Sequence, residues 1–204
     1  GGLSAGLILA SKGYDVHIYE KDDTVGGRSK ALKLGDFTFD AGPTFLLYVD
    51  VLRQVFTEAN LKLEDYITLM DVDPLYDLVF KDKVFTPSSN TEKTLKAIKE
   101  TFPGNEEGYL KFLHDQEILF NRVSPMMMKS FLSIKDLLSK HVIKNGPFIY
   151  PFKTIYQLLS RYFNDEELIY GMSFQAKYLG MSAWKAPALF TMLSFLEHKY
   201  GIYH

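Results

Sequence analysis

The stretch GGLSAG, residues 1–6, decides how the rest of the chain is interpreted. Gly2 and Gly6 lie one helical turn apart, and apolar residues recur with helical periodicity over residues 3–9. A helix with a bare glycine face can press closely onto a strand, and the unpaired N–H groups at its N-terminus suit a pyrophosphate. The stretch therefore predicts the back half of a glycine-rich dinucleotide-binding turn.

A strand and an acidic residue follow at the spacing that such a turn requires. Residues 14–20, YDVHIYE, alternate in polarity and predict a strand. Glu20 closes it 18 residues after Gly2, and dinucleotide-binding folds place an acid about 20 residues on, where it accepts hydrogen bonds from ribose hydroxyls. Because many helices use glycine only for packing, the combination supports a nucleotide site better than the glycines alone.

Paired glycines and an arginine come next. Gly26 and Gly27 allow the backbone to approach a ligand closely, and the planar guanidinium of Arg28 can hold a phosphate. Residues 29–40 predict a hairpin that turns at Gly35-Asp36, and residues 41–44, AGPT, end it in a rigid loop.

Taken together, these segments resemble the flavin-dependent oxidoreductases of the amine oxidase and phytoene desaturase superfamily. Within it, two segments are most similar to the bacterial carotenoid (phytoene or dehydrosqualene) desaturase branch. They are the sequences EKDDTVGGRSKAL at residues 20–32 and FTFDAGPTFLL at residues 37–47. The close resemblance covers residues 1–50, and the remainder matches only in character.

The resemblance implies FAD as the cofactor. It assigns the first turn to the pyrophosphate, Glu20 to the adenosine ribose, residues 26–28 to the phosphates and residues 41–44 to a loop near the flavin ring. The cofactor-binding residues so predicted are Gly1, Gly2, Ser4, Glu20, Lys21, Gly26, Gly27, Arg28, Ser29, Ala41, Gly42, Pro43 and Thr44. No catalytic acid or base is identified, and the histidines show no metal spacing.

The expected fold is α/β. A partial Rossmann-like FAD-binding domain over residues 1–65, with its first strand missing, precedes a mostly helical α+β substrate-binding domain over residues 66–204. Because the first fingerprint glycines and the family's C-terminal flavin segment are missing, we expect a piece truncated at both ends. Made alone, it is expected to be inactive and poorly stable.

Periodicity, caps and turn residues predict the remaining elements. The expected strands are residues 66–70, 75–81 and 83–86. The expected helices are residues 49–60, 89–102, 105–124, 134–144, 164–178 and 187–199.

The amino-acid composition excludes several classes of function. The net charge of -2 gives no reason to expect a nucleic-acid partner, and the absence of cysteine excludes disulfides and thiol chemistry. No apolar run reaches the ~18 residues that a membrane span needs. A cytoplasmic location, with the protein peripheral to the membrane, fits these features.

Residues 122–163 differ in charge from the chain as a whole. They carry seven Lys and Arg against one Asp, together with many bulky apolar residues. Such a stretch suits the surface of an anionic membrane, where a hydrophobic polyene substrate is stored. The alternative is an ordinary helical core with solvated lysines. Oligomeric state has no signature in the sequence.

The resemblance implies desaturation of phytoene or dehydrosqualene by hydride transfer to FAD, with oxygen or a quinone as the final electron acceptor. Two alternatives stay open. One is a retinol saturase-like enzyme or an amine oxidase of the same superfamily. The other is a non-enzymatic lipid-binding protein, like the Rab escort and GDP-dissociation inhibitor proteins that share the fold.

Overall fold

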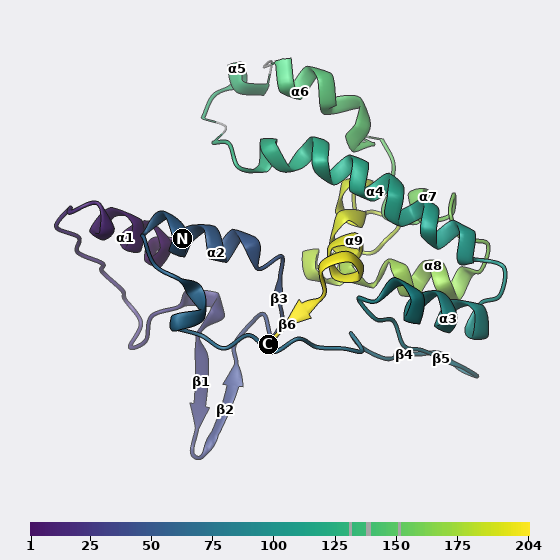
Figure 1. The fold of residues 1–204 in the computed structure, drawn as a ribbon, viewed down its shortest axis with the longest axis horizontal. Coiled ribbons are helices and arrows are strands. Elements are labelled where there is room, and N and C mark those ends of the chain that lie inside the picture. Colours follow the sequence, from purple (N-terminus) through teal and green to yellow (C-terminus); the bar gives the residue numbers. More distant parts are fainter. Residues whose placement is uncertain (131, 138–139, 151) are drawn as a thin grey trace. The chain divides into compact units, whose positions relative to one another are not determined.

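The computed structural model describes residues 1–130, 132–137, 140–150 and 152–204, which mix helices and strands (Figure 1). They form two compact units, one comprising Gly1–Val72 with Ile202–His204 and the other Asp73–Gly201. This mixed content agrees with the α/β class at the coarse level. The division into a cofactor domain at residues 1–65 and a substrate domain at residues 66–204 stays a prediction.

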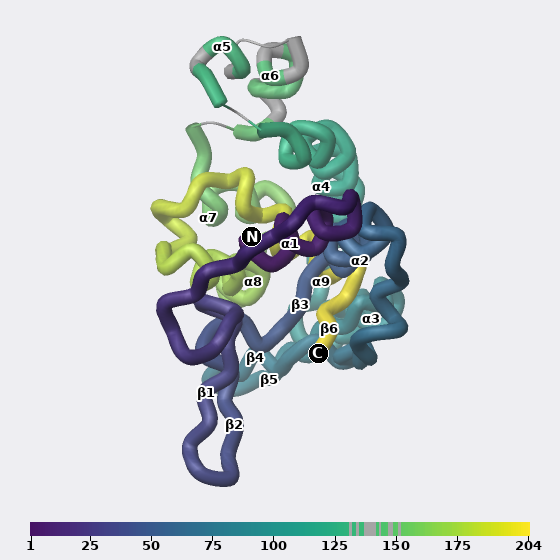
Figure 2. Tube along the Cα trace, turned by 90° about the vertical axis from the view of Figure 1, so that its left-hand side faces the viewer, coloured from purple at the N-terminus to yellow at the C-terminus, as the bar shows by residue number. Residues whose placement is uncertain are grey.

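The first unit combines two short helices with antiparallel strands. Its elements are α1 (Gly2–Ser11), η1 (Gly27–Ser29), β1 (Ala31–Leu34), β2 (Phe37–Asp40), β3 (Leu46–Leu47), α2 (Asp50–Glu58), η2 (Leu63–Asp65) and β6 (Ile202–Tyr203). Helix α1 packs beside α2 (Figure 2). The buried apolar residues of this unit are Val49, Ala59, Leu63 and Ile202, so its own core is small.

Helix α1 ends at Ser11, shortly before Gly13, and lies against the segment that follows it. Gly13 has a φ of +85°, and the Tyr14 N–H donates to the Leu9 carbonyl at 3.2 Å, which closes a Schellman-type end. The chain then returns along the helix. A Cβ on Gly6 would lie 2.7 Å from Ile18 Cδ1, so the predicted close approach at this glycine is confirmed.

The strand predicted at residues 14–20 is not formed, which corrects that expectation. A strand needs a neighbour to pair with. Among the described residues, no backbone segment is hydrogen-bonded to the backbone of residues 15–20. The alternating pattern therefore gives a segment that packs on α1 without a ladder.

The predicted hairpin is confirmed. Strands β1 and β2 pair antiparallel from Ala31↔Asp40 to Leu34↔Phe37. The positive φ of +62° falls on Gly35, the first of the two loop residues, as in a type II′ turn. All eight strand residues are exposed.

Strand β6 joins two distant parts of the first unit. It pairs with β3 in the register Leu46↔Tyr203 and Leu47↔Ile202. On its other edge it bonds to residues 70–72, where Met70 and His204 exchange backbone hydrogen bonds of 2.7 and 2.9 Å. The strand predicted at residues 66–70 is not formed. Of these residues, only Met70 is paired with β6 through backbone hydrogen bonds.

The second unit is mainly helical. Its elements are β4 (Leu78–Val79), β5 (Val84–Phe85), α3 (Thr91–Thr101), α4 (Glu106–Met127), α5 (Ile134–Leu137), α6 (Lys140–Asn145), η3 (Gly146–Ile149), α7 (Ile155–Leu159), α8 (Glu166–Met172), η4 (Phe174–Leu179), η5 (Ala188–Phe190) and α9 (Thr191–Tyr200). Helix α4 packs on α9. The largest buried side chains are Tyr109, Phe85, Phe102, Phe112, Phe163 and Phe195.

Most predicted helices of this unit are confirmed, with differences at their ends. The segments 89–92 and 164–167, which predicted helix starts, supply the N-caps Asn90 of α3 and Asp165 of α8, and the Asn90 side chain accepts from the Lys93 N–H at 3.0 Å. Helix α4 was expected to stop before Pro125 but continues to Met127, with Pro125 in its last turn. Helix α7 was not predicted.

Two predicted helices have different outcomes. The one expected over residues 134–144 appears as α5 and α6, and residues 138–139 lie outside the described residues. The one expected to reach Tyr178 ends as an α-helix at Met172 and continues as the 3₁₀ helix η4. Within the described part of the chain, no helix has the length and apolarity to cross a bilayer.

Candidate functional site

The first residues of the chain form the N-terminus of α1. Gly1 is its N-cap and no acidic residue lies in its first turn. No heavy atom lies within 4 Å of where a Cβ on Gly1 or Gly2 would stand, so the space beside the first turn is open. The N–H groups here lack helical partners and carry the positive end of the helix dipole. Gly1, Gly2 and Ser4 therefore lie where an anion can be held.

Glu20 is fixed by the backbone that follows it. Its Oε1 accepts from the Lys21 N–H at 2.8 Å and from the Asp22 N–H at 3.0 Å. Among the described residues Oε2 has no hydrogen-bond partner, and the side chain is exposed. One oxygen thus orients the carboxylate while the other is available to a hydroxyl donor.

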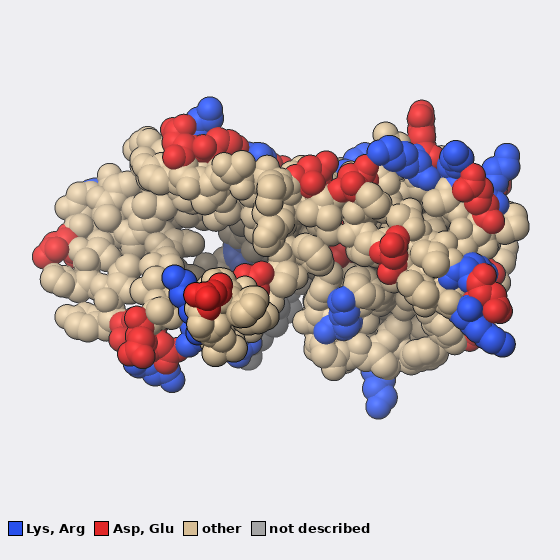
Figure 3. Space-filling model, turned by 90° about the horizontal axis from the view of Figure 1, so that it is seen from below, with Lys and Arg blue, Asp and Glu red and all other residues tan. Residues whose placement is uncertain are grey.

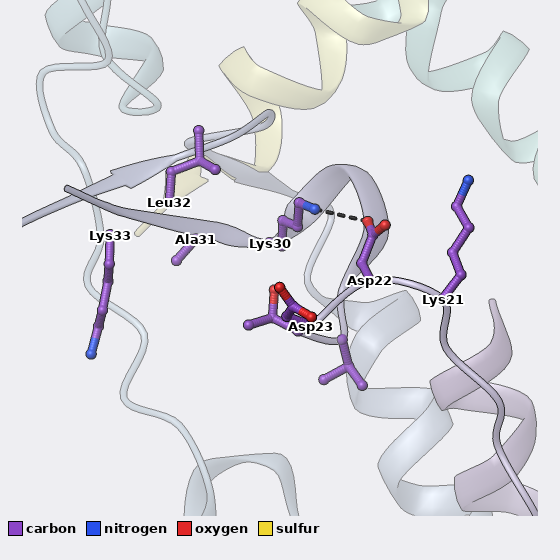
Figure 4. A pocket seen from close by; sticks show the side chains of 9 residues that line it. Lys21, Asp22, Asp23, Lys30, Ala31, Leu32 and Lys33 are labelled. Carbon is purple, nitrogen blue, oxygen red and sulfur yellow. Dashed lines mark hydrogen bonds and ion pairs between the residues drawn. The ribbon is translucent and has the colours of Figure 1, made fainter.

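An open depression of about 810 Å³ follows Glu20 (Figure 4). It is lined by Lys21, Asp22, Asp23, Thr24, Val25, Lys30, Ala31, Leu32 and Lys33. Lys30 and Asp22 point toward each other and form an ion pair of 2.8 Å, whereas Lys21 and Lys33 extend away from that pair. Of these residues only Lys21 was predicted; the polar composition of the loop was the available signal for the others.

The paired glycines form a turn that only glycine adopts easily. Gly26 and Gly27 have φ values of +118° and +58°. Gly26 is the N-cap of η1, and its carbonyl accepts from the Ser29 N–H at 3.0 Å. A Cβ on Gly26 would also lie 3.2 Å from Lys30 Cα. The turn places Arg28 in the middle of η1 with an exposed side chain.

Two predicted segments that are 13 residues apart in the sequence meet in the fold. A Cβ on Gly42 would stand 2.1 Å from the Arg28 carbonyl oxygen, so the backbone of the 41–44 loop lies directly against the paired-glycine turn. The Ala41 N–H donates to the Lys30 carbonyl at 3.0 Å and extends the hairpin to the loop. Gly42 is needed here for close approach.

The site residues thus fall into two groups. Residues 26–29 and 41–44 are brought together, and Glu20 is linked to them through the Lys30–Asp22 ion pair. Within the described chain, no hydrogen bond or ion pair joins Gly1, Gly2 or Ser4 to these residues. Thr44 has a contact that the sequence did not suggest, because its carbonyl lies 3.2 Å from Nδ1 of His204.

Sequence reasoning also missed a buried polar cluster in the second unit. Glu197 is fully buried; its Oε1 accepts from the Tyr178 hydroxyl at 3.0 Å. Its Oε2 accepts from the Tyr76 hydroxyl at 3.0 Å and from the Gln175 amide. Burial raises the pKa of Glu197, and the same burial together with the carboxylate raises the pKa of Tyr178. Nothing in the local sequence marks these residues as partners.

The neighbouring His198 is buried as well. Its Nδ1 lies 3.0 Å from the Tyr109 hydroxyl, and burial lowers the pKa of His198 to about 4. The described residues contain no group of three or more His, Cys, Asp or Glu side chains that could hold a metal ion. On the face seen in Figure 3, basic and acidic side chains are interspersed.

Known proteins resemble the whole of this chain. The family described as flavin containing amine oxidoreductase matches residues 1–202. The chain is 39% identical to a 4,4'-diapophytoene desaturase (4,4'-diapolycopene-forming) of Methylomonas sp, covering 100% of this chain and 40% of that protein. It is 36% identical to a 4,4'-diapolycopen-4-al dehydrogenase of Metabacillus indicus, covering 100% and 42%.

A third relative is named as a phytoene desaturase. The chain is 33% identical to a zeta-carotene-forming phytoene desaturase of Myxococcus xanthus, covering 100% of this chain and 40% of that protein. The chain therefore spans about two fifths of the length of the curated relatives that it matches.

Proposed function

Because this chain belongs to the family of flavin-containing amine oxidoreductases, we propose that the whole protein is an FAD-dependent oxidoreductase that desaturates a carotenoid precursor, phytoene or dehydrosqualene. The structural observation that best supports this proposal is the contact between Gly42 and the Arg28 carbonyl. It brings together the two segments that the resemblance assigns to the phosphates and to the flavin ring.

The residues present fit an adenine dinucleotide. The open N-terminus of α1 suits the pyrophosphate, and the available Oε2 of Glu20 suits the ribose hydroxyls. The paired-glycine turn leaves its backbone accessible, and Arg28 is exposed beside it. We assign the cofactor to these residues and to the loop 41–44.

The Rossmann-like arrangement is part of the same proposal. The close packing of Gly6 on Ile18 supports this part, because a dinucleotide-binding domain packs the glycine face of its first helix closely onto the sheet. In such a domain residues 14–20 pair with neighbouring parallel strands. The substrate-binding part is then the one expected over residues 66–204.

The chemistry divides between cofactor and protein. A bound flavin supplies the hydride acceptor, which no side chain of this chain offers. The polyene has no polar groups, so the chain's residues serve to bind the cofactor, orient it and exclude water. With the cofactor held by these residues, desaturation would remove a hydride from an allylic carbon and a proton from the adjacent carbon. We assign no side chain to that proton.

Peripheral membrane contact through residues 122–163 is a further part of the proposal. Exposed apolar side chains in this range are Met127, Met128, Leu132 and Phe152, of which Leu132 is 90% and Phe152 95% exposed. Lys129 and Lys153 are adjacent to two of them in the sequence. Exposed apolar groups beside cations favour an anionic lipid surface. Co-sedimentation with anionic and neutral vesicles tests this.

A second substrate class is supported by one specific observation. The relative from Metabacillus indicus is named for an aldehyde, 4,4'-diapolycopen-4-al, and is almost as similar as the desaturase from Methylomonas sp. A carotenoid aldehyde is therefore the alternative substrate. The retinol saturase-like and amine oxidase alternatives differ from both in substrate, and the lipid-binding alternative differs in lacking a flavin.

Anaerobic titration of the intact protein with each substrate tests the proposal. We expect phytoene or dehydrosqualene to bleach the visible flavin absorption and to yield a product with additional conjugated double bonds. A flavin spectrum that responds only to a carotenoid aldehyde would move the assignment to the second substrate class. A flavin spectrum that responds to none of them would contradict both.

A further inference from the structure

The loop assigned to the flavin ring is held by residues from the other end of the chain. Strand β6, at Ile202–Tyr203, lies between β3 and residues 70–72 and is bonded to both. Strand β3 begins two residues after Thr44. The position of the 41–44 loop therefore depends on residues 202–204 as well as on its neighbours in the sequence.

A side chain completes this connection. Nδ1 of His204 lies 3.2 Å from the Thr44 carbonyl oxygen, and the backbone of His204 is fixed by its two hydrogen bonds to Met70. A carbonyl oxygen only accepts, so this contact requires the proton on Nδ1. The imidazole is thus a donor that holds the direction of the Thr44 peptide group.

The two ends of the loop are then fixed by different means. At Ala41 the loop is fixed by a backbone hydrogen bond to the Lys30 carbonyl, and at Thr44 it is fixed by a side-chain donor. The direction of a peptide group decides whether an N–H or a carbonyl faces a ligand. A residue that sets this direction acts on the ligand without touching it.

We infer that His204 is a positioning residue for the loop 41–44 and, through Thr44, for the isoalloxazine ring of the bound cofactor. This inference rests on the proposed function, since it takes the loop to lie near the flavin. It adds a residue that no sequence motif marked, because His204 is separated from Thr44 by 160 positions.

The test uses three variants of the intact holoenzyme. His204→Ala removes the donor, and His204→Asn retains an N–H donor on a shorter side chain. His17→Ala is the matched control, since His17 is an exposed histidine of the same unit whose ring contacts Asp15 at 3.4 Å. For each we would measure the Kd for FAD, the visible spectrum, and kcat and KM for the polyene.

We expect His204→Ala to raise the Kd for FAD about three- to tenfold, the effect of one lost hydrogen bond, and to alter the visible band. It should lower kcat more than it changes KM, and His204→Asn should recover at least part of each loss. His17→Ala should match the wild type.

Two results would overturn the inference. One is a His204→Ala enzyme with wild-type affinity, spectrum and kcat. The other is an equal loss in the Ala and Asn variants accompanied by an equal fall in melting temperature, which would identify a purely structural role. Failure of the proposed function itself is distinguishable, because the wild-type protein would then carry no flavin before any substitution is made.

Discussion

A Cβ on Gly42 would stand 2.1 Å from the Arg28 carbonyl oxygen, a distance that no real Cβ contact adopts. The obstructing atom belongs to the backbone, so no rotamer change can relieve it. The paired-glycine turn and the loop 41–44 can keep their present contact only while residue 42 is glycine.

Gly42→Ala should therefore separate the two segments. We expect a destabilisation of about 1–3 kcal/mol, as for other overpacked sites, and a loss of FAD affinity larger than tenfold in the intact protein. Asp36→Ala, at the exposed turn of the same hairpin, is the control. Urea unfolding and fluorescence titration with FAD measure the two effects. Unchanged affinity in Gly42→Ala would show that the contact is irrelevant to the cofactor.

Gly6 offers a contrasting case, because the atom near it is flexible. A Cβ there would lie 2.7 Å from Cδ1 of Ile18, the far end of a side chain that is 52% exposed. Gly6→Ala should be tolerated after a rotamer change at Ile18, whereas Gly6→Val should cost about 1–3 kcal/mol.

Removing the obstructing methyl group should suppress that cost. The double variant Gly6→Val with Ile18→Ala should recover part of the stability that Gly6→Val loses, and a double-mutant cycle from urea midpoints measures the coupling. Strictly additive effects would mean that helix α1 does not press on residues 14–20 in solution.

The buried carboxyl of Glu197 makes stability depend on pH in a defined direction. Burial, the largest cause, raises the pKa of Glu197 in the folded state above its ordinary value of 4.5. The folded protein then binds this proton more tightly than the unfolded chain does. The contribution of the proton to the free energy of unfolding is therefore complete below pH 4.5 and is lost as the pH rises through the folded-state pKa.

Comparison with Glu197→Gln isolates this effect. The stability difference in favour of the wild type should shrink as the pH rises from 4.5, since the variant has no proton to lose. Urea unfolding of both proteins from pH 4.5 to 8 measures it. A wild-type advantage that grows with pH would show that the ionised carboxylate is the favoured buried form.

The buried His198 makes stability depend on pH in the opposite direction to Glu197. Burial lowers the pKa of His198 from 6.5 to about 4, so the folded state disfavours the proton. Stability from this group is fully present above pH 6.5 and is lost as the pH falls toward 4, by about 3 kcal/mol at most. His198→Gln should flatten this acid-side loss in melting temperature. An identical acid-side profile in both proteins would contradict a buried neutral imidazole.

Local features of the sequence predicted local structure well. The hairpin at Ala31–Asp40, the helix start within residues 89–92 and the glycine contact at Gly6 depend on neighbouring residues, and each is confirmed. The strand at residues 14–20 failed because alternation reports a suitable surface, while a ladder also needs a partner. The predicted cofactor residues themselves stay predictions.

Features that depend on distant residues could not be predicted. Glu197 and Tyr76 are 121 positions apart, and one sequence gives no sign that a helical glutamate will be buried against a tyrosine. The same holds for His204 and Thr44. Burial and pairing of this kind are set by tertiary packing, for which neither periodicity nor motif spacing is a guide.

Glu20 provides the most direct test of the account, because its free Oε2 is assigned to the ribose of the cofactor. The measurement is the affinity of the intact protein for FAD, followed by visible absorption and fluorescence, in the wild type and in Glu20→Ala. Hydrogen bonds to a charged group are worth about 1.5–3 kcal/mol, so we predict a yellow wild-type protein and an affinity roughly 10- to 100-fold weaker in the variant. A colourless wild-type protein, or a variant that binds FAD as tightly as the wild type, would contradict the central claim.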